Sequence, residues 1–235
     1  MITVEHLDAG YGKFHILHDV SLQTMRGKIT AVVGPNGSGK STLLKSIFGQ
    51  TAIYRGVIRL DGAVITGKPS HIISRLGVSY LPQLNNLFTG LTVKENLLMS
   101  GYMLDEEERE ARLSTALEMF PFLRSAMSRK AYTLSGGERQ MLSIGMTLMR
   151  RPKVIMMDEP TASLSPKMSN LVLDVVRSLR DNYGFTVILA EQNVIRSLRL
   201  ADHAVLMVSG QVAFEGSPQD LLENKELGQM YLGLR

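Results

Sequence analysis

The chain has 235 residues, of which 44% are apolar and 20% charged, a composition typical of globular proteins that excludes disordered and fibrous classes. Its net charge at pH 7 is +4, but the sequence contains no run of five basic residues, so no nucleic-acid partner is expected. The lack of cysteine excludes a disulfide framework and a cysteine-ligated metal. Since neither a signal-peptide pattern nor a stretch of 18 apolar residues is present, we do not expect this chain to span a membrane.

The first third of the sequence is predicted to be rich in β-strands. Apolar and polar residues alternate from the start, as in a half-buried strand, and short apolar runs end at glycine and proline. We expect strands over residues 2–7, 16–25, 29–33 and 78–81, a small hairpin over 56–65, and helices over 39–48 and 69–76.

The rest of the chain changes character twice. Residues 90–150 show helical spacing and no strand pattern, whereas strands and helices alternate again after residue 150, which predicts a mostly parallel sheet with helices on both faces. The fold is therefore predicted to be α/β, with an N-terminal antiparallel β part and an inserted α-helical subdomain. We expect helices over 92–101, 105–119, 135–149, 166–182 and 193–200, strands over 154–157, 185–190, 203–208 and 211–214, and a terminal helical stretch from residue 217.

Residues 34–41 read GPNGSGKS and match the phosphate-loop pattern G-x-x-x-x-G-K-[ST], between a predicted strand and a predicted helix. In such a loop the backbone N–H groups and the helix N-terminus bind phosphate oxygens, Lys40 reaches the β- and γ-phosphates, and the Ser41 hydroxyl ligates Mg²⁺. The alternative is a glycine-rich turn that matches by chance. We predict ATP and Mg²⁺ as cofactors, a P-loop NTPase (RecA-like) core, and nucleotide contacts from Gly34, Pro35, Asn36, Gly37, Ser38, Gly39, Lys40, Ser41 and Thr42.

An acid pair, Asp158-Glu159, follows the apolar run of residues 154–157. A buried parallel strand delivers such residues to the sheet edge where ligands bind. We expect Asp158 to hold Mg²⁺, directly or through water, and Glu159 to act as the base for the attacking water. The alternative is an ordinary strand end in solvent, which the phosphate loop in the same chain disfavours.

Residues 134–140 read LSGGERQ, which resembles the signature motif of ABC-transporter ATPases. An N-terminal serine cap would explain Ser135 alone but not the seven-residue match. The resemblance covers the chain from Tyr11 to the closing helix and implies that two such subunits close head to tail around two ATP molecules. Each phosphate loop would then face the partner's signature residues, which are Leu134, Ser135, Gly136, Gly137, Glu138 and Gln140.

The same resemblance implies further roles and boundaries. Tyr11 would stack on adenine, rather than being a surface tyrosine, and Gln83 would touch Mg²⁺ together with Ser41 and Asp158, rather than being an ordinary loop glutamine. The whole chain, 1–235, would be one ABC ATPase domain. Its parts would be a nucleotide-binding core over 1–89 and 151–216, a helical signature subdomain over 90–150, and a helical segment over 217–235.

Two positions depart from the family pattern. Ser165 stands where the loop after the acid pair usually has aspartate, and Gln192 stands where a switch histidine is expected. An amide can donate to a γ-phosphate but carries no charge and does not titrate. We therefore expect the catalytic set Glu159, Gln83 and Gln192, with capping of the next helix as the alternative role of Gln192.

The sequence Glu191-Gln192-Asn193 and the closing residues 230–233 are similar to the shorter ATPase of branched-chain (hydrophobic) amino-acid importers. This implies a peripheral subunit on the cytoplasmic face of the membrane. Its partners would be a second ATPase, either a longer paralogue or an identical copy, two transmembrane permease subunits and an external solute-binding protein. Alternatives are a urea or amide importer, a soluble ABC ATPase without transport, a regulatory module that does not hydrolyse ATP, and a kinase, which would lack the signature.

Overall fold

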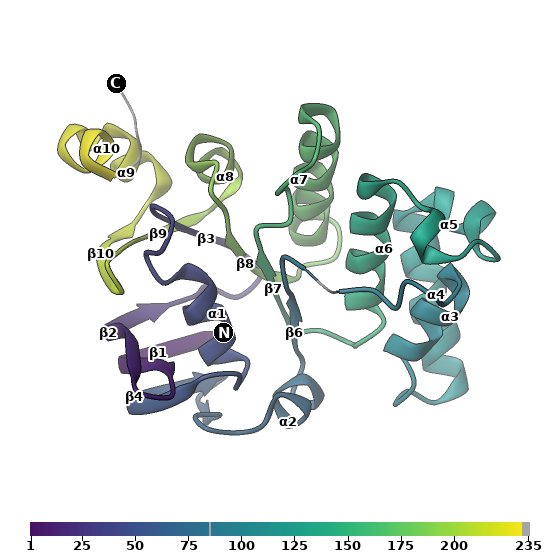
Figure 1. Ribbon diagram of the computed structural model, residues 1–235, viewed down its shortest axis with the longest axis horizontal. Helices are drawn as coiled ribbons and strands as arrows, with labels where there is room; N and C mark the ends of the chain where they lie inside the picture. Colours follow the sequence, from purple (N-terminus) through teal and green to yellow (C-terminus); the bar gives the residue numbers. More distant parts are fainter. Residues whose placement is uncertain (85, 232–235) are drawn as a thin grey trace.

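The computed structural model describes residues 1–84 and 86–231 and contains two β-sheets. The N-terminal sheet is antiparallel, as predicted, with the strand order β2-β1-β4-β5. It lies at the lower left of Figure 1. Its strands are β1 (Ile2–Tyr11), β2 (Phe14–Gln23), β4 (Ala52–Leu60) and β5 (Ala63–Val64).

The larger sheet has the order β10-β9-β3-β8-β7-β6 and is parallel except for β10, which pairs antiparallel with β9. Every residue of β3, β7 and β8 is buried, which explains why these strands appear in the sequence as continuous apolar runs. The strands are β3 (Ile29–Val33), β6 (Val78–Leu81), β7 (Val154–Asp158), β8 (Thr186–Ala190), β9 (His203–Val208) and β10 (Gln211–Gly216).

Helices cover both faces of the larger sheet, and the sequence alternation within each strand decides which face each helix meets. Val32, Met156 and Ile188 pack with α1 (Lys40–Ile47) in the layer between the two sheets. Their neighbours on the opposite face pack against α7 (Pro166–Asp181) and α8 (Val194–Leu200), seen above the sheet in Figure 1. The remaining helices of this part are α2 (Ser70–Arg75), α9 (Pro218–Glu223) and α10 (Lys225–Tyr231).

A group of helices fills residues 93–148, at the right of Figure 1, and within this described stretch no strand occurs. The helices are α3 (Val93–Ser100), α4 (Glu106–Met119), α5 (Pro121–Ala126), a 3₁₀ turn (Ala131–Thr133) and α6 (Gly136–Leu148). Helix α5 was not expected from the sequence. It is short and begins with proline at its first position, directly after α4, so hydrophobic periodicity alone does not separate it from its neighbours.

The first hairpin also differs from the prediction. Strand β1 continues to Tyr11 instead of ending at Leu7, and β2 begins at Phe14. Register shifts along β1 interrupt its alternation, which is why the sequence pattern breaks before the strand ends. At the other end of the chain, the predicted helical segment forms α9 and α10, and its residues 232–235 lie outside the described residues.

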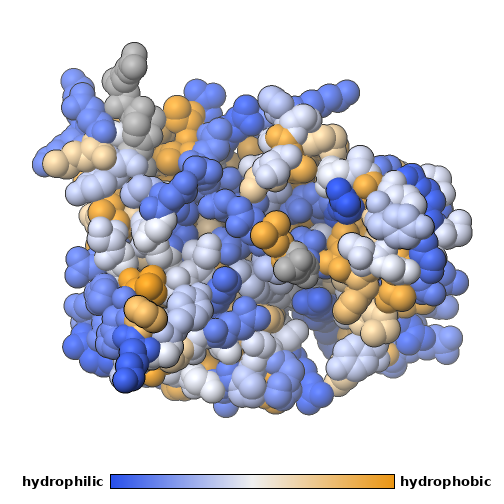
Figure 2. All heavy atoms as spheres, in the orientation of Figure 1, coloured by the Kyte–Doolittle hydropathy of each residue, from blue (hydrophilic) through white to orange (hydrophobic). Residues whose placement is uncertain are grey.

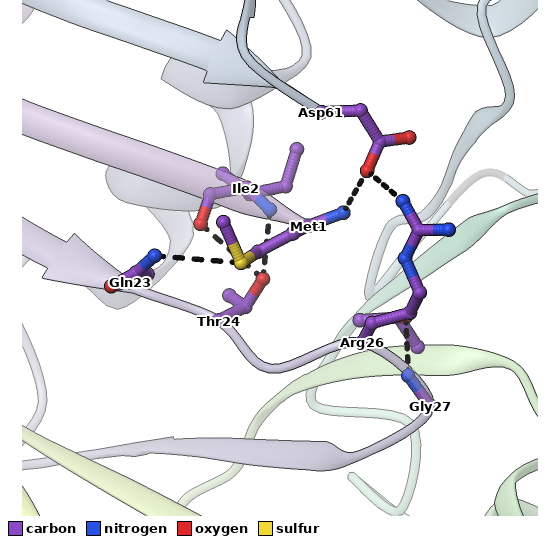
Figure 3. Close-up of polar contacts among 8 residues, drawn as sticks. Met1, Ile2, Gln23, Thr24, Arg26, Gly27 and Asp61 are labelled. Carbon is purple, nitrogen blue, oxygen red and sulfur yellow. Dashed lines mark hydrogen bonds and ion pairs between the residues drawn. The ribbon is translucent and has the colours of Figure 1, made fainter.

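The start of β1 is fixed by polar contacts, drawn in Figure 3. The Thr24 hydroxyl accepts from the Ile2 backbone N–H at 2.9 Å and donates to the Ile2 carbonyl at 3.3 Å. The Met1 ammonium donates to Asp61 at 2.8 Å, and Arg26 donates to the same oxygen at 2.7 Å. These contacts connect the start of β1 to the segments that follow β2 and β4. Across residues 1–84 and 86–231, no helix has the length and apolarity needed to cross a bilayer.

Candidate functional site

The loop between β3 and α1 requires glycine at two positions. Gly34 has φ +147°, and a Cβ there would lie 2.1 Å from the Met207 carbonyl oxygen. Gly39 caps α1 with φ +103°, and a Cβ there would lie 2.9 Å from the side chain of Leu17. Only glycine combines these φ values with such close approaches, so the loop keeps its backbone against β2 and β9. This geometry is the one a phosphate-binding loop needs.

Lys40 begins α1 and is only 5% exposed. Its Nζ donates to the carbonyls of Gly34 at 2.8 Å and Pro35 at 2.9 Å, so the ammonium folds over its own loop. Burial lowers the pKa of Lys40, and the charges of Glu159 and Asp158 act in the opposite direction. A phosphate in the loop would supply the anionic partner that the two neutral carbonyls do not.

Ser41 and Asp158 meet at the carboxyl end of β7. The Ser41 hydroxyl donates to Asp158 Oδ1 at 2.8 Å, and the Tyr80 hydroxyl donates to Oδ2 at 3.0 Å. Asp158 is 3% exposed. The pKa of Tyr80 is raised, mainly because its hydroxyl is buried and also because of the adjacent Asp158 charge. A hydroxyl beside a carboxylate suits Mg²⁺, which binds oxygen ligands. No group of three acidic, histidine or cysteine residues that could hold a metal ion occurs within residues 1–84 and 86–231.

Glu159 follows Asp158 in a left-handed backbone conformation, with φ +48°. This conformation costs a non-glycine residue roughly 1–2 kcal/mol and is common at functional sites. Its backbone N–H donates to the Ala190 carbonyl at 2.8 Å, and its carboxylate accepts from Gln83 Nε2 at 2.8 Å. Gln83 thus lies against the expected base, while its expected contact with Mg²⁺ remains a prediction.

A cavity of about 380 Å³ opens beside Glu159 and is lined by Gln192, Asn193 and Arg196 among others. The Gln192 side chain is exposed. The cap of α8 is Asn193, whose side chain accepts from the Arg196 N–H at 3.2 Å. The capping role considered for Gln192 therefore belongs to its neighbour, and the Gln192 amide is left on the cavity wall.

The signature residues begin α6. Ser135 caps the helix by accepting from the Glu138 N–H at 3.3 Å, and Glu138 accepts from the Ser135 N–H at 2.7 Å. The bond from the Ser135 backbone is the main cause that lowers the pKa of Glu138. Leu134 and Gly137 are buried and Gln140 is half-buried, whereas Gly136 is exposed beside Ser135 at the helix start. The helix start is thus presented to solvent in a fixed shape.

The structure does not bring the signature and the phosphate loop together. Helix α1 packs mainly on β1, β2, β4, β7 and β8, whereas α6 packs mainly on α3, α4, β6 and α7. In Figure 1 the two helices lie on different sides of β7. One subunit therefore carries the two motifs on separate surfaces.

Tyr11 ends β1 and is 41% exposed, opposite Phe14, which is 77% exposed. The turn between them is supported by Tyr54, whose hydroxyl donates to the Gly12 carbonyl at 2.9 Å. The Tyr54 ring stacks on His15 with ring centroids 3.9 Å apart. A tyrosine presented on such a supported turn is available for stacking with a planar ligand.

Sequence reasoning missed three residues at this site: Tyr80, Thr161 and Glu191. A tyrosine inside a buried strand needs a hydrogen-bond partner, which was the available signal for Tyr80. Glu191 is 4% exposed and accepts from the backbone and hydroxyl of Thr161, which lies 30 positions away in the chain. No local sequence pattern predicts that contact.

Comparison with known proteins agrees with this geometry. Residues 17–162 match the ABC transporter family. The chain belongs to that family. Over 234 residues it is 50% identical to a probable branched-chain amino acid transport ATP-binding protein of Archaeoglobus fulgidus, covering 100% of this chain and 99% of the relative.

A second relative is a high-affinity branched-chain amino acid transport ATP-binding protein of Pseudomonas aeruginosa. It is 37% identical to this ABC protein, covering 99% of this chain and 100% of the relative. Among solved structures, an ATP-binding cassette in its ADP conformation superposes with a TM-score of 0.87 at 29% identity, with 97% of each chain covered. This structural similarity, together with the family match, confirms the predicted P-loop α/β fold.

Proposed function

We propose that this chain is the ATP-hydrolysing subunit of an importer for branched-chain or other hydrophobic amino acids. The observation that carries the proposal is its 50% identity, over the full length of both chains, to the A. fulgidus branched-chain amino acid transport protein. The arrangement of Lys40, Ser41, Asp158 and Glu159 at one edge of the sheet supports the ATPase part of this proposal.

In the proposed reaction, the phosphate loop binds ATP and Lys40 transfers its two hydrogen bonds from loop carbonyls to the β- and γ-phosphates. Ser41 and Asp158 would hold Mg²⁺, which when bound would neutralise developing phosphate charge. Glu159 accepts a proton from the attacking water, and Gln83, whose Nε2 donates to the Glu159 carboxylate at 2.8 Å, helps to orient that base. Gln192 donates to the γ-phosphate as a neutral group.

The same reasoning supports a dimer as the active unit. The exposed start of α6 lies apart from the phosphate loop of its own chain. A second ATPase subunit would therefore supply the backbone N–H groups at the start of its own α6 to the γ-phosphate. Hydrolysis here depends on positioning and electrostatics, so it would proceed only in the closed pair. The partner would be a longer ATPase or a second copy of this chain.

A groove between α2 and the helical subdomain supports a membrane partner. Its cavity measures about 580 Å³, and Figure 2 shows the molecule hollowed there, between α2 at the lower edge and the helices at the right. Its lining includes the apolar side chains of Phe88, Tyr102 and Met103, which are 55%, 69% and 55% exposed. Arg150 also lines it, and burial lowers the pKa of that guanidinium.

We propose that a short cytoplasmic helix of the permease fills this groove, with apolar residues against Phe88 and Tyr102 and an acidic residue near Arg150. The chain would thereby lie peripherally on the cytoplasmic face of the membrane. Closure of the ATPase pair would move the groove and so drive the permease.

Transport itself tests the proposal. Vesicles containing this chain, its partner ATPase, the permease pair and the binding protein should take up radiolabelled leucine only when ATP and Mg²⁺ are enclosed. Uptake of urea but not leucine would reassign the solute. A chain that hydrolyses ATP but co-purifies with no multi-spanning protein would contradict the transport role while leaving the ATPase role intact.

A further inference from the structure

A buried carboxylate outside the proposed catalytic set lies at the end of β8. Glu191 is 4% exposed, and a carboxylate this deeply buried needs several hydrogen-bond donors. Its Oε1 accepts from the Thr161 backbone N–H at 3.0 Å and from the Thr161 hydroxyl at 2.8 Å. Its Oε2 accepts from the Gln192 backbone N–H at 3.2 Å.

The hydrogen bonds to Glu191 and its burial have opposite effects on the pKa of its carboxyl. The pKa of the Glu191 carboxyl is raised overall, chiefly by burial and also by the charge of Glu159, while the bonds from Thr161 and Gln192 act in the opposite direction. Because all three bonds are accepted by the carboxylate, the ionised form is the one that this arrangement fits.

On one side, Glu191 holds the turn that contains the proposed base. The Ala162 N–H donates to the Glu159 carbonyl at 3.0 Å, so Thr161 lies inside the turn that sets the backbone of Glu159. Glu159 has φ +48°, a sparsely populated conformation that persists only where its surroundings hold it. The two bonds to Thr161 supply such a restraint.

On the other side, Glu191 holds the segment of the proposed γ-phosphate donor through the Gln192 backbone. Glu159, Thr161, Glu191 and Gln192 all line the same cavity of about 380 Å³. One buried side chain thus connects the segment that carries the base with the segment that carries the phosphate donor.

We propose that Glu191 is a positioning residue for ATP hydrolysis, which holds Glu159 and Gln192 in a fixed relation through Thr161 and the Gln192 backbone. This inference rests on the proposed ATPase function. Neither Glu191 nor Thr161 contacts the phosphate loop or Tyr11 through any hydrogen bond of the described residues, so their loss acts on the hydrolytic step and not on ATP binding.

The test measures kcat and KM for ATP on the full-length chain, in the presence of Mg²⁺ and its partner ATPase. Thr161→Val removes the hydroxyl donor to Glu191. Glu191→Gln replaces one carboxylate oxygen with an NH₂ group, which cannot accept a hydrogen bond from the donor that faces it. Each is expected to lower kcat about tenfold with KM unchanged, since a bond to a charged group is lost. The double variant should lose much less than the product of the two, because both changes break one network. Thr161→Ser keeps the hydroxyl and should restore kcat.

The matched control is Thr24→Val, because Thr24 also bonds a distant backbone through its hydroxyl, in the N-terminal sheet (Figure 3). It should lower the melting temperature and leave kcat unchanged. Wild-type kcat in Thr161→Val, or full additivity with Glu191→Gln, would overturn the proposal. Failure of the ATPase function itself would look different, because wild-type protein would then show no activity that Glu159→Gln abolishes.

Discussion

The phosphate loop and the signature helix make contrasting use of a helix N-terminus. At α1 the tip of the loop, residues 35–37, is exposed, but Lys40 is buried and turns back onto loop carbonyls, and Ser41 already contacts Asp158 across the sheet edge. At α6 the first residues satisfy each other through Ser135 and Glu138, and the helix start remains exposed. The first arrangement can bind a nucleotide within one chain, whereas the second is complete without a ligand and available to another chain.

The largest effect that separates the two regions is expected at the phosphate loop. Lys40→Ala removes the cation at the β- and γ-phosphates and should abolish ATP binding or weaken it severely. Titration with a fluorescent ATP analogue at fixed Mg²⁺ measures this on the isolated chain. Unchanged affinity would contradict the assigned role of the loop.

A change at the signature helix should have the opposite profile. Gly136 is exposed, and a Cβ there would lie 3.7 Å from the Leu164 side chain, so Gly136→Asp fits sterically. An added carboxylate favours the helix N-terminus but repels a γ-phosphate brought by a partner. We expect unchanged ATP affinity of the isolated chain, an unchanged or slightly higher melting temperature, and at least a tenfold loss of hydrolysis. The neutral variant Gly136→Asn is the control and should lose less activity.

A smaller effect is expected at Tyr11, on the nucleotide side of the comparison. Tyr11→Ala should weaken ATP binding by roughly 1–3 kcal/mol, the scale of base–aromatic stacking. GTP should lose a similar amount, because stacking depends on the ring face and not on its edge groups. A strong loss for ATP without any for GTP would assign Tyr11 another role.

The smallest effect concerns the capping pair of α6. Because the pKa of Glu138 is lowered by its bonds from Ser135, its ionised form stabilises the fold above the unfolded pKa of about 4.3, and this contribution is lost as pH falls through the lower folded pKa. Since Glu138 is partly exposed, Glu138→Gln should cost no more than about 1 kcal/mol at pH 7. Melting curves of both proteins should converge only once the pH falls below the folded pKa of Glu138, which lies under the unfolded value of about 4.3. A difference that persists there would contradict an electrostatic origin.

Much of this fold could be predicted because burial leaves a local mark. The strands β3, β7 and β8 are buried along their whole length and mostly apolar, the phosphate loop follows β3 directly, and the acid pair stands at the end of β7. The continuation of β1 was hidden by its register shifts, and α5 by its shortness. Each of these features depends on pairing or packing that local periodicity does not record.

The candidate site divides in the same way. Residues contributed by a contiguous motif, such as Lys40 and Ser41, could be found by spacing. Glu191 could not, since its importance comes from Thr161 and from its burial, and both depend on how the ends of β7 and β8 lie side by side. The roles of Gln83 and Gln192 toward the nucleotide also stay predictions, because they depend on the bound state.

The central claim is that a complete hydrolytic site requires two subunits. Glu159→Gln keeps the phosphate loop and removes the base, so it should bind ATP, hydrolyse it orders of magnitude more slowly and accumulate a closed pair. The measurement is the solution mass of this variant with ATP and Mg²⁺, alone and mixed with the partner ATPase. Our account predicts a shift from the single-chain mass of 26.0 kDa to that of a pair with ATP and not with ADP. A variant that binds ATP yet stays a single chain in every mixture, or that hydrolyses ATP at the wild-type rate, would contradict it.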